Sequence, residues 1–247
     1  MNQLFLDIFF SLPRQGPGDP ASTRRAFQSV KAAGAVENIL DIGCGVGTQT
    51  MDLARISDAP IVTLDFFRIG LDVLAGRVRE KNLQDRIAIV HGDMNSLPFK
   101  PGSFDLVWSE GAIFVMGFQN GLREWRRYLR PRGFMAITEL AWIAGDPPPE
   151  LQEFWDRQYP AITGIEENIS ILEKCGYRLL DRFILPEDAW WKDLYLPLEK
   201  RVEEARKIQR DEESREILDR MQEEIEIYRR FSKYYGYVFF VMQKMDL

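Results

Sequence analysis

The segment at residues 39–50, ILDIGCGVGTQT, restricts the fold of this chain more than any other. An apolar run leads into a loop with glycine at every second position, and a helix-forming segment follows. A second apolar run, residues 60–66, carries an acidic residue, Asp65, at its end. Glycines let backbone approach a ligand closely, and the start of the next helix offers free N–H groups. The pattern predicts a strand–helix–strand unit for a nucleoside, with Asp65 placed to accept hydrogen bonds from ribose hydroxyls.

The glycine spacing distinguishes between nucleoside ligands. A dinucleotide fingerprint reads G-x-G-x-x-G or A, and counting from Gly43 its last position falls on Thr48. The chain instead reads D-x-G-x-G-x-G from Asp41 to Gly47. This spacing disfavours a dehydrogenase, and it leaves a glycine turn without any ligand as the structural alternative.

Length and composition fit one large α/β domain of 247 residues, with 45% hydrophobic and 28% charged residues. No run approaches the roughly 18 apolar residues that span a bilayer, so we expect no membrane partner. The apolar start, residues 1–15, carries Asp7 and lacks the basic region and cleavage site of a signal peptide. We expect an ordered amphipathic segment there. Cys44 and Cys175 are too few for a disulfide framework and favour a cytoplasmic location.

The net charge of −6 disfavours a nucleic-acid partner, because nucleic-acid binders usually carry a basic surplus or stripe. The densest basic cluster is local and is best explained as the solvated face of one helix; it comprises Arg123, Arg126, Arg127, Arg130 and Arg132.

Strands and helices are expected to alternate through the first 142 residues. Asp19 and Pro20 predict the start of a helix that Gly34 ends. The expected strands are residues 36–42, 61–66, 86–91, 104–109 and 133–142, with helices between most of them. This order predicts a parallel sheet with helices on both faces.

The second half follows a different pattern. Thr163 and Glu166 predict a capping box for a helix that Gly176 ends. Residues 177–186 and 235–245 are expected to be strands, and the charged stretch between them predicts one or two amphipathic helices. These helices would form either a cap over the ligand edge or an oligomerisation arm, so a homodimer is one possible assembly.

Residues 36–142 resemble class I S-adenosylmethionine (SAM) methyltransferases. GPGDP at residues 16–20 and SEGAIFVMGF at 109–118 look like a bacterial and archaeal subgroup of small-molecule type. The resemblance implies an α/β fold with a doubly wound, mostly parallel, seven-stranded Rossmann-like sheet. In that family a tight hairpin joins the last two strands, so the helical insertion at 186–235 is a departure.

The resemblance also implies roles for individual residues. Asp41, Gly43, Cys44, Gly45 and Gly47 would lie under the methionine part of SAM. Asp65 would bind the ribose, and Phe66 would lie against the adenine ring. Asp93 and the backbone N–H of Met94 would contact adenine.

The residues after the fourth strand would form the reaction centre. Ser109 and Glu110 would lie beside the sulfonium, with Glu110 the catalytic candidate and a helix cap its structural alternative. Gly16, in GPGDP, would let the N-terminal segment close over the cofactor. Arg14 would pair with the methionine carboxylate or stand as a plain surface arginine.

The sequence favours a mechanism with little acid–base assistance. The only histidine, His91, is expected to be a packing or hydrogen-bonded residue, and no cluster has metal-ligand spacing. Methyl transfer from a sulfonium is a direct in-line displacement that mainly needs alignment and exclusion of water. A set of aromatic residues would either pack a core or line an acceptor pocket; it comprises Trp142, Phe154, Trp155, Tyr159, Trp190, Trp191 and Tyr195.

The whole chain is thus expected to be one methyltransferase domain, residues 1–247. It would comprise an N-terminal lid (1–35), a SAM-binding core (36–142) and a C-terminal half (143–247) with the cap at 186–235. The expected activity is transfer of a methyl group from SAM to a small-molecule acceptor, leaving S-adenosylhomocysteine (SAH). The alternatives are a non-catalytic SAM- or SAH-binding regulatory module and a methyltransferase for RNA or protein.

Overall fold

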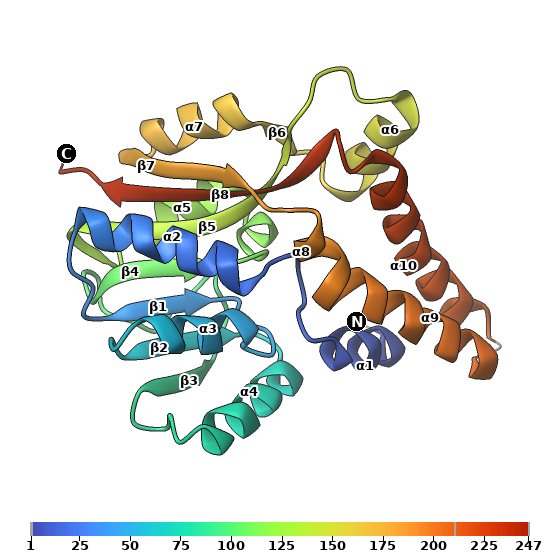
Figure 1. Ribbon diagram of the computed structural model, residues 1–247, viewed down its shortest axis with the longest axis horizontal. Helices are drawn as coiled ribbons and strands as arrows, with labels where there is room; N and C mark the ends of the chain where they lie inside the picture. Colours follow the sequence, from blue (N-terminus) through green and yellow to red (C-terminus); the bar gives the residue numbers. More distant parts are fainter. Residues whose placement is uncertain (1, 210, 247) are drawn as a thin grey trace.

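A computed structural model describes residues 2–209 and 211–246, which surround one mixed sheet (Figure 1). The main strands have the order β3-β2-β1-β4-β5-β8-β7. The first five are parallel, and β8 runs antiparallel to both of its neighbours. The strands are β1 (Ile39–Ile42), β2 (Ile61–Asp65), β3 (Ile87–His91), β4 (Phe104–Ser109), β5 (Leu129–Trp142), β7 (Tyr177–Ile184) and β8 (Tyr235–Lys244). The doubly wound, mostly parallel sheet predicted from the sequence is confirmed.

One short strand was not predicted. β6 (Thr163–Gly164) pairs with the end of β5, which makes the sheet eight-stranded instead of seven-stranded. This pairing also makes the predicted capping box wrong. Because the backbone of Thr163 pairs with Ala141, helix α7 (Ile165–Lys174) begins after Gly164 and has no side-chain cap.

Helices cover both faces of the sheet and enclose two apolar cores. On one face lie α2 (Pro20–Ala33), α3 (Thr48–Ile56) and α4 (Arg68–Glu80); on the other lie α5 (Phe118–Arg126) and α7 (Figure 1). Side chains alternate along each strand, so Trp108 of β4 points into the first core and Val107 into the second. As predicted, α2 begins with Asp19 as N-cap and ends at Gly34.

The segment between β7 and β8 is helical, as predicted. It contains α8 (Asp188–Trp190), a π-helical turn η2 (Trp191–Tyr195), α9 (Leu196–Ile208) and α10 (Glu212–Phe231). These helices lie beyond the carboxyl ends of the parallel strands, beside α1 (Gln3–Ser11) and near α6 (Pro149–Gln158) (Figure 1). The apolar stripe of α10 is buried within the chain itself. Among the described residues, no helix has both the length and the apolarity of a membrane span.

Candidate active site at the carboxyl edge of the sheet

The glycine loop between β1 and α3 adopts backbone conformations that favour glycine. Gly43, Gly45 and Gly47 have φ values of +74°, +54° and +77°. A Cβ atom on Gly43 would lie 2.4 Å from the Cβ of Ala112, and one on Gly47 would lie 2.2 Å from Leu74. Side chains at these positions would therefore be strained and would also collide with neighbours. The geometry of the loop therefore requires glycine at these positions.

Asp65 ends β2 directly against this loop. Its Oδ2 accepts a hydrogen bond from the Gly45 N–H at 2.8 Å, and its Oδ1 accepts one from the Phe67 N–H at 2.8 Å. Burial raises the pKa of Asp65, and these backbone N–H groups oppose the shift. A carboxylate oxygen has two lone-pair sites, so both oxygens retain acceptor capacity. The neighbouring Phe66 is 59% exposed and leaves an aromatic face at the same edge.

Asp41 and Cys44 lie beneath the loop and are buried. Asp41 Oδ2 accepts a hydrogen bond from the Thr50 hydroxyl, whereas its Oδ1 has no hydrogen-bond partner among the described residues. Burial is the largest of the influences that raise the pKa of Asp41 to about 7. Burial also raises the pKa of the Cys44 thiol, which keeps it protonated and unreactive at neutral pH.

Residues 12–18, which we call the strap, pass over the glycine loop. The Thr48 hydroxyl donates to the Pro13 carbonyl, and the Val46 N–H donates to the side-chain Oε1 of Gln15 at 3.0 Å. That oxygen occupies the space beside Gly45, where a Cβ would lie 2.6 Å from it. The strap can therefore approach the loop this closely because Gly45 has no side chain.

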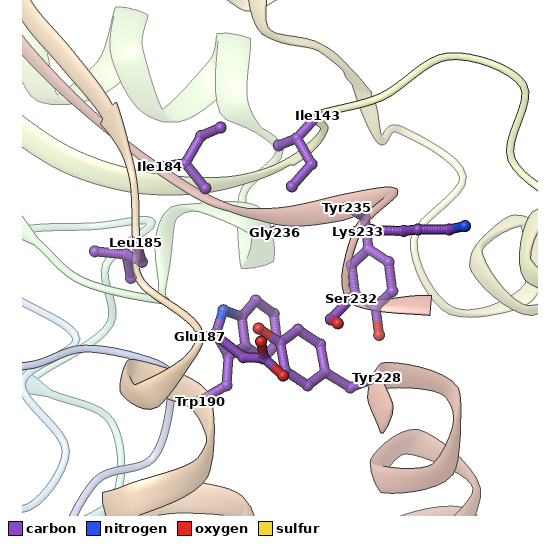
Figure 2. A pocket seen from close by; sticks show the side chains of 10 residues that line it. All are labelled: Ile143, Ile184, Leu185, Glu187, Trp190, Tyr228, Ser232, Lys233, Tyr235 and Gly236. Carbon is purple, nitrogen blue, oxygen red and sulfur yellow. The ribbon is translucent and has the colours of Figure 1, made fainter. Parts of the chain in front are cut away.

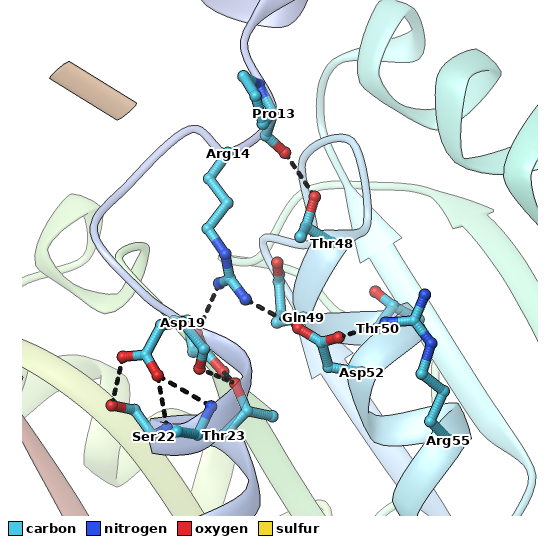
Figure 3. Close-up of polar contacts among 12 residues, drawn as sticks. Pro13, Arg14, Asp19, Ser22, Thr23, Thr48, Gln49, Thr50, Asp52 and Arg55 are labelled. Carbon is cyan, nitrogen blue, oxygen red and sulfur yellow. Dashed lines mark hydrogen bonds and ion pairs between the residues drawn. The ribbon is translucent and has the colours of Figure 1, made fainter. Parts of the chain in front are cut away.

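Arg14 anchors the strap from beneath (Figure 3). Its guanidinium pairs with Asp52 of α3 at 3.0 Å and with Glu110 at 3.0 Å, and the arginine is only 3% exposed. Arg55 adds a second cation on Asp52 at 2.7 Å. Of the two readings offered for Arg14, the plain surface arginine is wrong, and pairing with a methionine carboxylate stays a prediction.

Glu110 is buried at the start of the loop that follows β4. Besides Arg14, it accepts hydrogen bonds from the Thr23 hydroxyl at 2.8 Å and the Trp108 indole N–H at 3.0 Å. Burial raises the pKa of Glu110, and the Arg14 guanidinium opposes the shift. The alternative of a helix cap is wrong, because the next helical turn, η1 (Ile113–Val115), has no side-chain cap. A catalytic role stays a prediction.

The other predicted residues lie around the same edge with different partners. The Ser109 hydroxyl donates to the Ile42 carbonyl at 2.9 Å and so joins β4 to β1. Gly16 approaches Gly111 closely, since a Cβ on Gly16 would lie 3.6 Å from the Gly111 Cα. Asp93 is exposed and accepts two hydrogen bonds from Asn95. Met94 reaches the glycine loop, 3.7 Å from the position of a Gly43 Cβ.

Sequence reasoning missed three residues that hold this arrangement together: Gln15, Thr23 and Asp52. Gln15 contacts the loop, and Thr23 and Asp52 complete the surroundings of Arg14 and Glu110. One signal was available, because Asp52 stands between Met51 and Leu53 in a largely buried stretch of its helix. A charged residue on a buried helix face indicates an ionic partner.

The aromatic set predicted near the edge is mostly core. Trp190 stacks on Tyr228 with ring centres 4.2 Å apart, and Trp190 and Tyr195 are 2% and 1% exposed. Beside this stack, a cavity of about 220 Å³ opens between the strand ends and the insertion (Figure 2). Its wall combines Trp190 and Tyr228 with aliphatic side chains such as Ile143. The described residues form no group of three or more side chains suited to a metal ion.

Comparisons with known proteins agree with this geometry. Residues 39–133 match the family model described as a methyltransferase domain. A methyltransferase named GfsG from Streptomyces halstedii is 36% identical over 107 residues, covering 43% of this chain and 38% of that protein. A demethylmenaquinone methyltransferase from Clavibacter sepedonicus is 37% identical over 129 residues, covering 52% of this chain and 50% of that protein. The match thus spans half or less of the length of these two relatives.

The fold likeness extends over the whole chain. A SAM-dependent methyltransferase from Thiobacillus denitrificans, solved in complex with SAH, superposes with a TM-score of 0.81 at 16% identity, covering 98% of each chain. The architecture is that of class I methyltransferases. Residues 39–133, which contain the glycine loop and Asp65, match the methyltransferase domain family, and the Thiobacillus protein of the same fold holds SAH.

Proposed function

We propose that this protein is a SAM-dependent methyltransferase that acts on a small-molecule acceptor. The observation that carries the proposal is the Asp65 carboxylate at the tip of β2, held 2.8 Å from the N–H of a left-handed glycine in a loop with glycine at every second position. The proposal covers the activity, the acceptor class and a direct displacement mechanism. A cytoplasmic location fits the two free cysteines.

The residues at this edge fit SAM in chemistry and in space. The three glycines of the loop allow backbone contact with the methionine part, and Asp65 offers carboxylate oxygens to the two ribose hydroxyls. The unpartnered Oδ1 of Asp41 beneath the loop is a further acceptor for a positively charged group. Exposed Phe66 presents a ring face for adenine.

SAM, when bound, supplies a methyl group on a sulfonium that is already activated for displacement. The chain's own residues must then align the acceptor and exclude water. The strap lies over the glycine loop and is fixed by Arg14, so it is placed to exclude water from that side. The insertion lies over the neighbouring part of the edge, and we propose that it is a cap that completes an acceptor site.

Titration calorimetry with SAM, SAH and NAD tests the proposal. We expect SAM and SAH to bind and NAD not to bind. Asp65→Ala should weaken SAM binding at least about a hundredfold, because each hydrogen bond to a charged acceptor contributes about 1.5–3 kcal/mol. Exposed Asp85 supplies the matched control, and Asp85→Ala should leave SAM affinity unchanged. NAD binding, or a folded Asp65→Ala variant with full SAM affinity, would refute the assignment.

Incubation with methyl-labelled SAM and a metabolite extract tests the transfer itself. A labelled small-molecule product is the expected result. Tight SAM binding without any labelled product would instead identify a regulatory binding module.

A further inference from the structure

A second buried glutamate, Glu139, lies at the same edge of the sheet and has no part in the arrangement described above. β5 pairs with β4 as far as Ser109 and Ile137, so Glu139 stands two residues beyond the end of β4. It is 1% exposed. Its neighbours along the strand on the same face, Ile137 and Ala141, belong to the core under α5 and α7. Glu139 therefore reaches the reaction edge from the face opposite the strap.

The carboxylate of Glu139 is only half satisfied. Its Oε1 accepts a hydrogen bond from the Tyr159 hydroxyl at 2.6 Å, and its Oε2 is buried with no hydrogen-bond partner among the described residues. Tyr159 follows α6, and its ring meets the edge of Phe114 with centres 6.0 Å apart. One carboxylate oxygen is thus fixed by a donor while the other is free to take one.

The charge of Glu139 is not compensated. The titratable groups that act on it or respond to it are the Tyr159 and Tyr237 hydroxyls, and neither is a cation. Burial raises the pKa of Glu139 to about 8, and the Tyr159 hydrogen bond opposes the shift. An ionised carboxylate in such surroundings is stabilised most by a ligand that brings a positive charge.

A short apolar segment lies beside Tyr159. The η1 turn lies between Gly111 and Gly117, whose φ values are +67° and +77°. Its residues Phe114 and Val115 are 41% and 60% exposed. A Cβ on Gly117 would meet no atom within 4 Å, so the segment is loosely packed at that end. It places exposed apolar side chains beside Tyr159.

We propose that Glu139, positioned by Tyr159, binds the protonated amine of the methyl acceptor and removes its proton before transfer. The assignment rests on the proposed function and names its acceptor class as amines. The N–H bond breaks, the proton moves to Glu139 Oε2, and the nitrogen regains its lone pair. That lone pair forms the bond to the methyl carbon as the carbon–sulfur bond breaks, and SAH leaves with the sulfur electron pair. Glu139 then releases its proton to water, which restores the carboxylate, and the product leaves as the methylated ammonium.

Calorimetry on the SAH-loaded protein tests this assignment without a known substrate. The probes are benzylamine, 2-phenylethylamine and cyclohexylamine, each beside the alcohol of the same carbon skeleton. We expect at least one amine to bind tenfold or more tighter than its alcohol at pH 8. Because the free carboxyl is protonated at lower pH, amine affinity should rise about tenfold per pH unit between pH 6 and 7.5, with release of one proton. Alcohol binding should not depend on pH.

Three variants separate positioning from structure. Glu139→Gln should lose the amine preference and its pH dependence while keeping SAH affinity. Tyr159→Phe should keep the preference but move the pH midpoint upward, since the hydrogen bond that lowers the pKa of Glu139 is gone. The matched control is Glu166→Gln, a glutamate with a 79% exposed side chain paired with Arg182, and it should match the unmodified protein.

The outcomes separate the two proposals. A protein that does not bind SAH refutes the proposed function, and the acceptor assignment falls with it. SAH binding with no amine bound, with equal affinity for amines and alcohols, or with an amine preference that survives Glu139→Gln overturns the acceptor assignment alone.

Discussion

Glu110 and Glu139 are two buried glutamates at one edge of one sheet, and their surroundings differ in the partners that the chain supplies. Glu110, on the strap side, is paired with Arg14 at 3.0 Å and receives two further hydrogen bonds. Glu139, on the opposite face, has one neutral donor and an unpartnered oxygen. Burial raises the pKa of both carboxyls, and an adjacent cation opposes the shift only at Glu110.

This difference distinguishes a carboxylate that holds the structure together from one that is available to a ligand. A charge whose partners all come from the chain holds segments together and has little left for a ligand. A buried charge without partners costs stability, and that cost is recovered when a ligand supplies the missing partner. The catalytic candidate named from sequence, Glu110, is of the first kind, while Glu139 is of the second.

The largest expected effect comes from removing the cation on the Glu110 side. Arg14→Met keeps the length of the side chain but leaves Glu110 without its ionic partner and Asp52 with Arg55 alone. Because an uncompensated buried charge is costly, the free energy of unfolding should fall by about 3–5 kcal/mol. Denaturant unfolding followed by circular dichroism measures it.

A surface arginine provides the control for that measurement. Arg201 is half exposed and pairs with Glu204 one turn along its helix. Arg201→Met should change the free energy of unfolding by no more than about 1 kcal/mol. Equal losses in the two variants would show that the Arg14 cluster is no more than a surface ion pair in energetic terms.

The next effect is a change of stability with pH, and in this case the substitution should stabilise the protein. Folded Glu139 keeps its proton up to a pKa of about 8, while in the unfolded chain it ionises near 4.5. The folded state therefore binds more protons between these values, and this group's contribution to stability is lost as pH rises from about 4.5 to 8. Glu139→Gln removes the loss and keeps an acceptor for Tyr159. At pH 9 the variant should be more stable than the unmodified protein by about 1–3 kcal/mol and should melt at a higher temperature. At pH 5 the two melting temperatures should match. A constant difference across pH would contradict the assignment.

The smallest expected effects come from removing one hydroxyl donor from each of the two glutamates. Thr23→Val deletes a donor to Glu110, where Arg14 favours the ionised form, and should cost about 1.5–2 kcal/mol. Tyr159→Phe deletes a donor to the neutral form of Glu139 at pH 7 and should cost about 1 kcal/mol or less. Parallel urea titrations give the ordering, and a larger loss for Tyr159→Phe would reverse the comparison.

Local sequence signals predicted the half of the molecule in which neighbours in sequence are neighbours in space. Strand β1, the glycine loop and β2 follow one another, so their apolar runs and the position of Asp65 sufficed to predict the unit. The Asp19 cap of α2 was equally local, since its oxygen receives N–H groups two and three residues away. The helical insertion was predicted from the apolar positions that recur at helical spacing along it.

What the sequence could not predict is contact between distant segments. Arg14 meets Asp52 and Glu110 across 38 and 96 residues, and no local pattern indicates which carboxylates an arginine will face. Glu139 lies in an apolar run that predicts a strand, and only the fold brings Tyr159 beside it. Thr163 carried a good capping pattern, but pairing with β5 decided its conformation.

The strap has a consequence for the order in which the chain matures. Its backbone N–H groups at Arg14 and Gly18 donate to the carbonyls of Asp193 and Ala189, which lie 179 and 171 residues further along the chain. During synthesis the strap emerges before its partners, and it cannot close these two bonds until residues 189 and 193 have been made. Contacts of such long sequence separation form slowly, because the loop between them must be closed before they contribute. A ribosome-bound nascent chain halted before residue 189 would therefore contain the strap's partners in the glycine loop but would lack the two bonds that join the strap to the insertion.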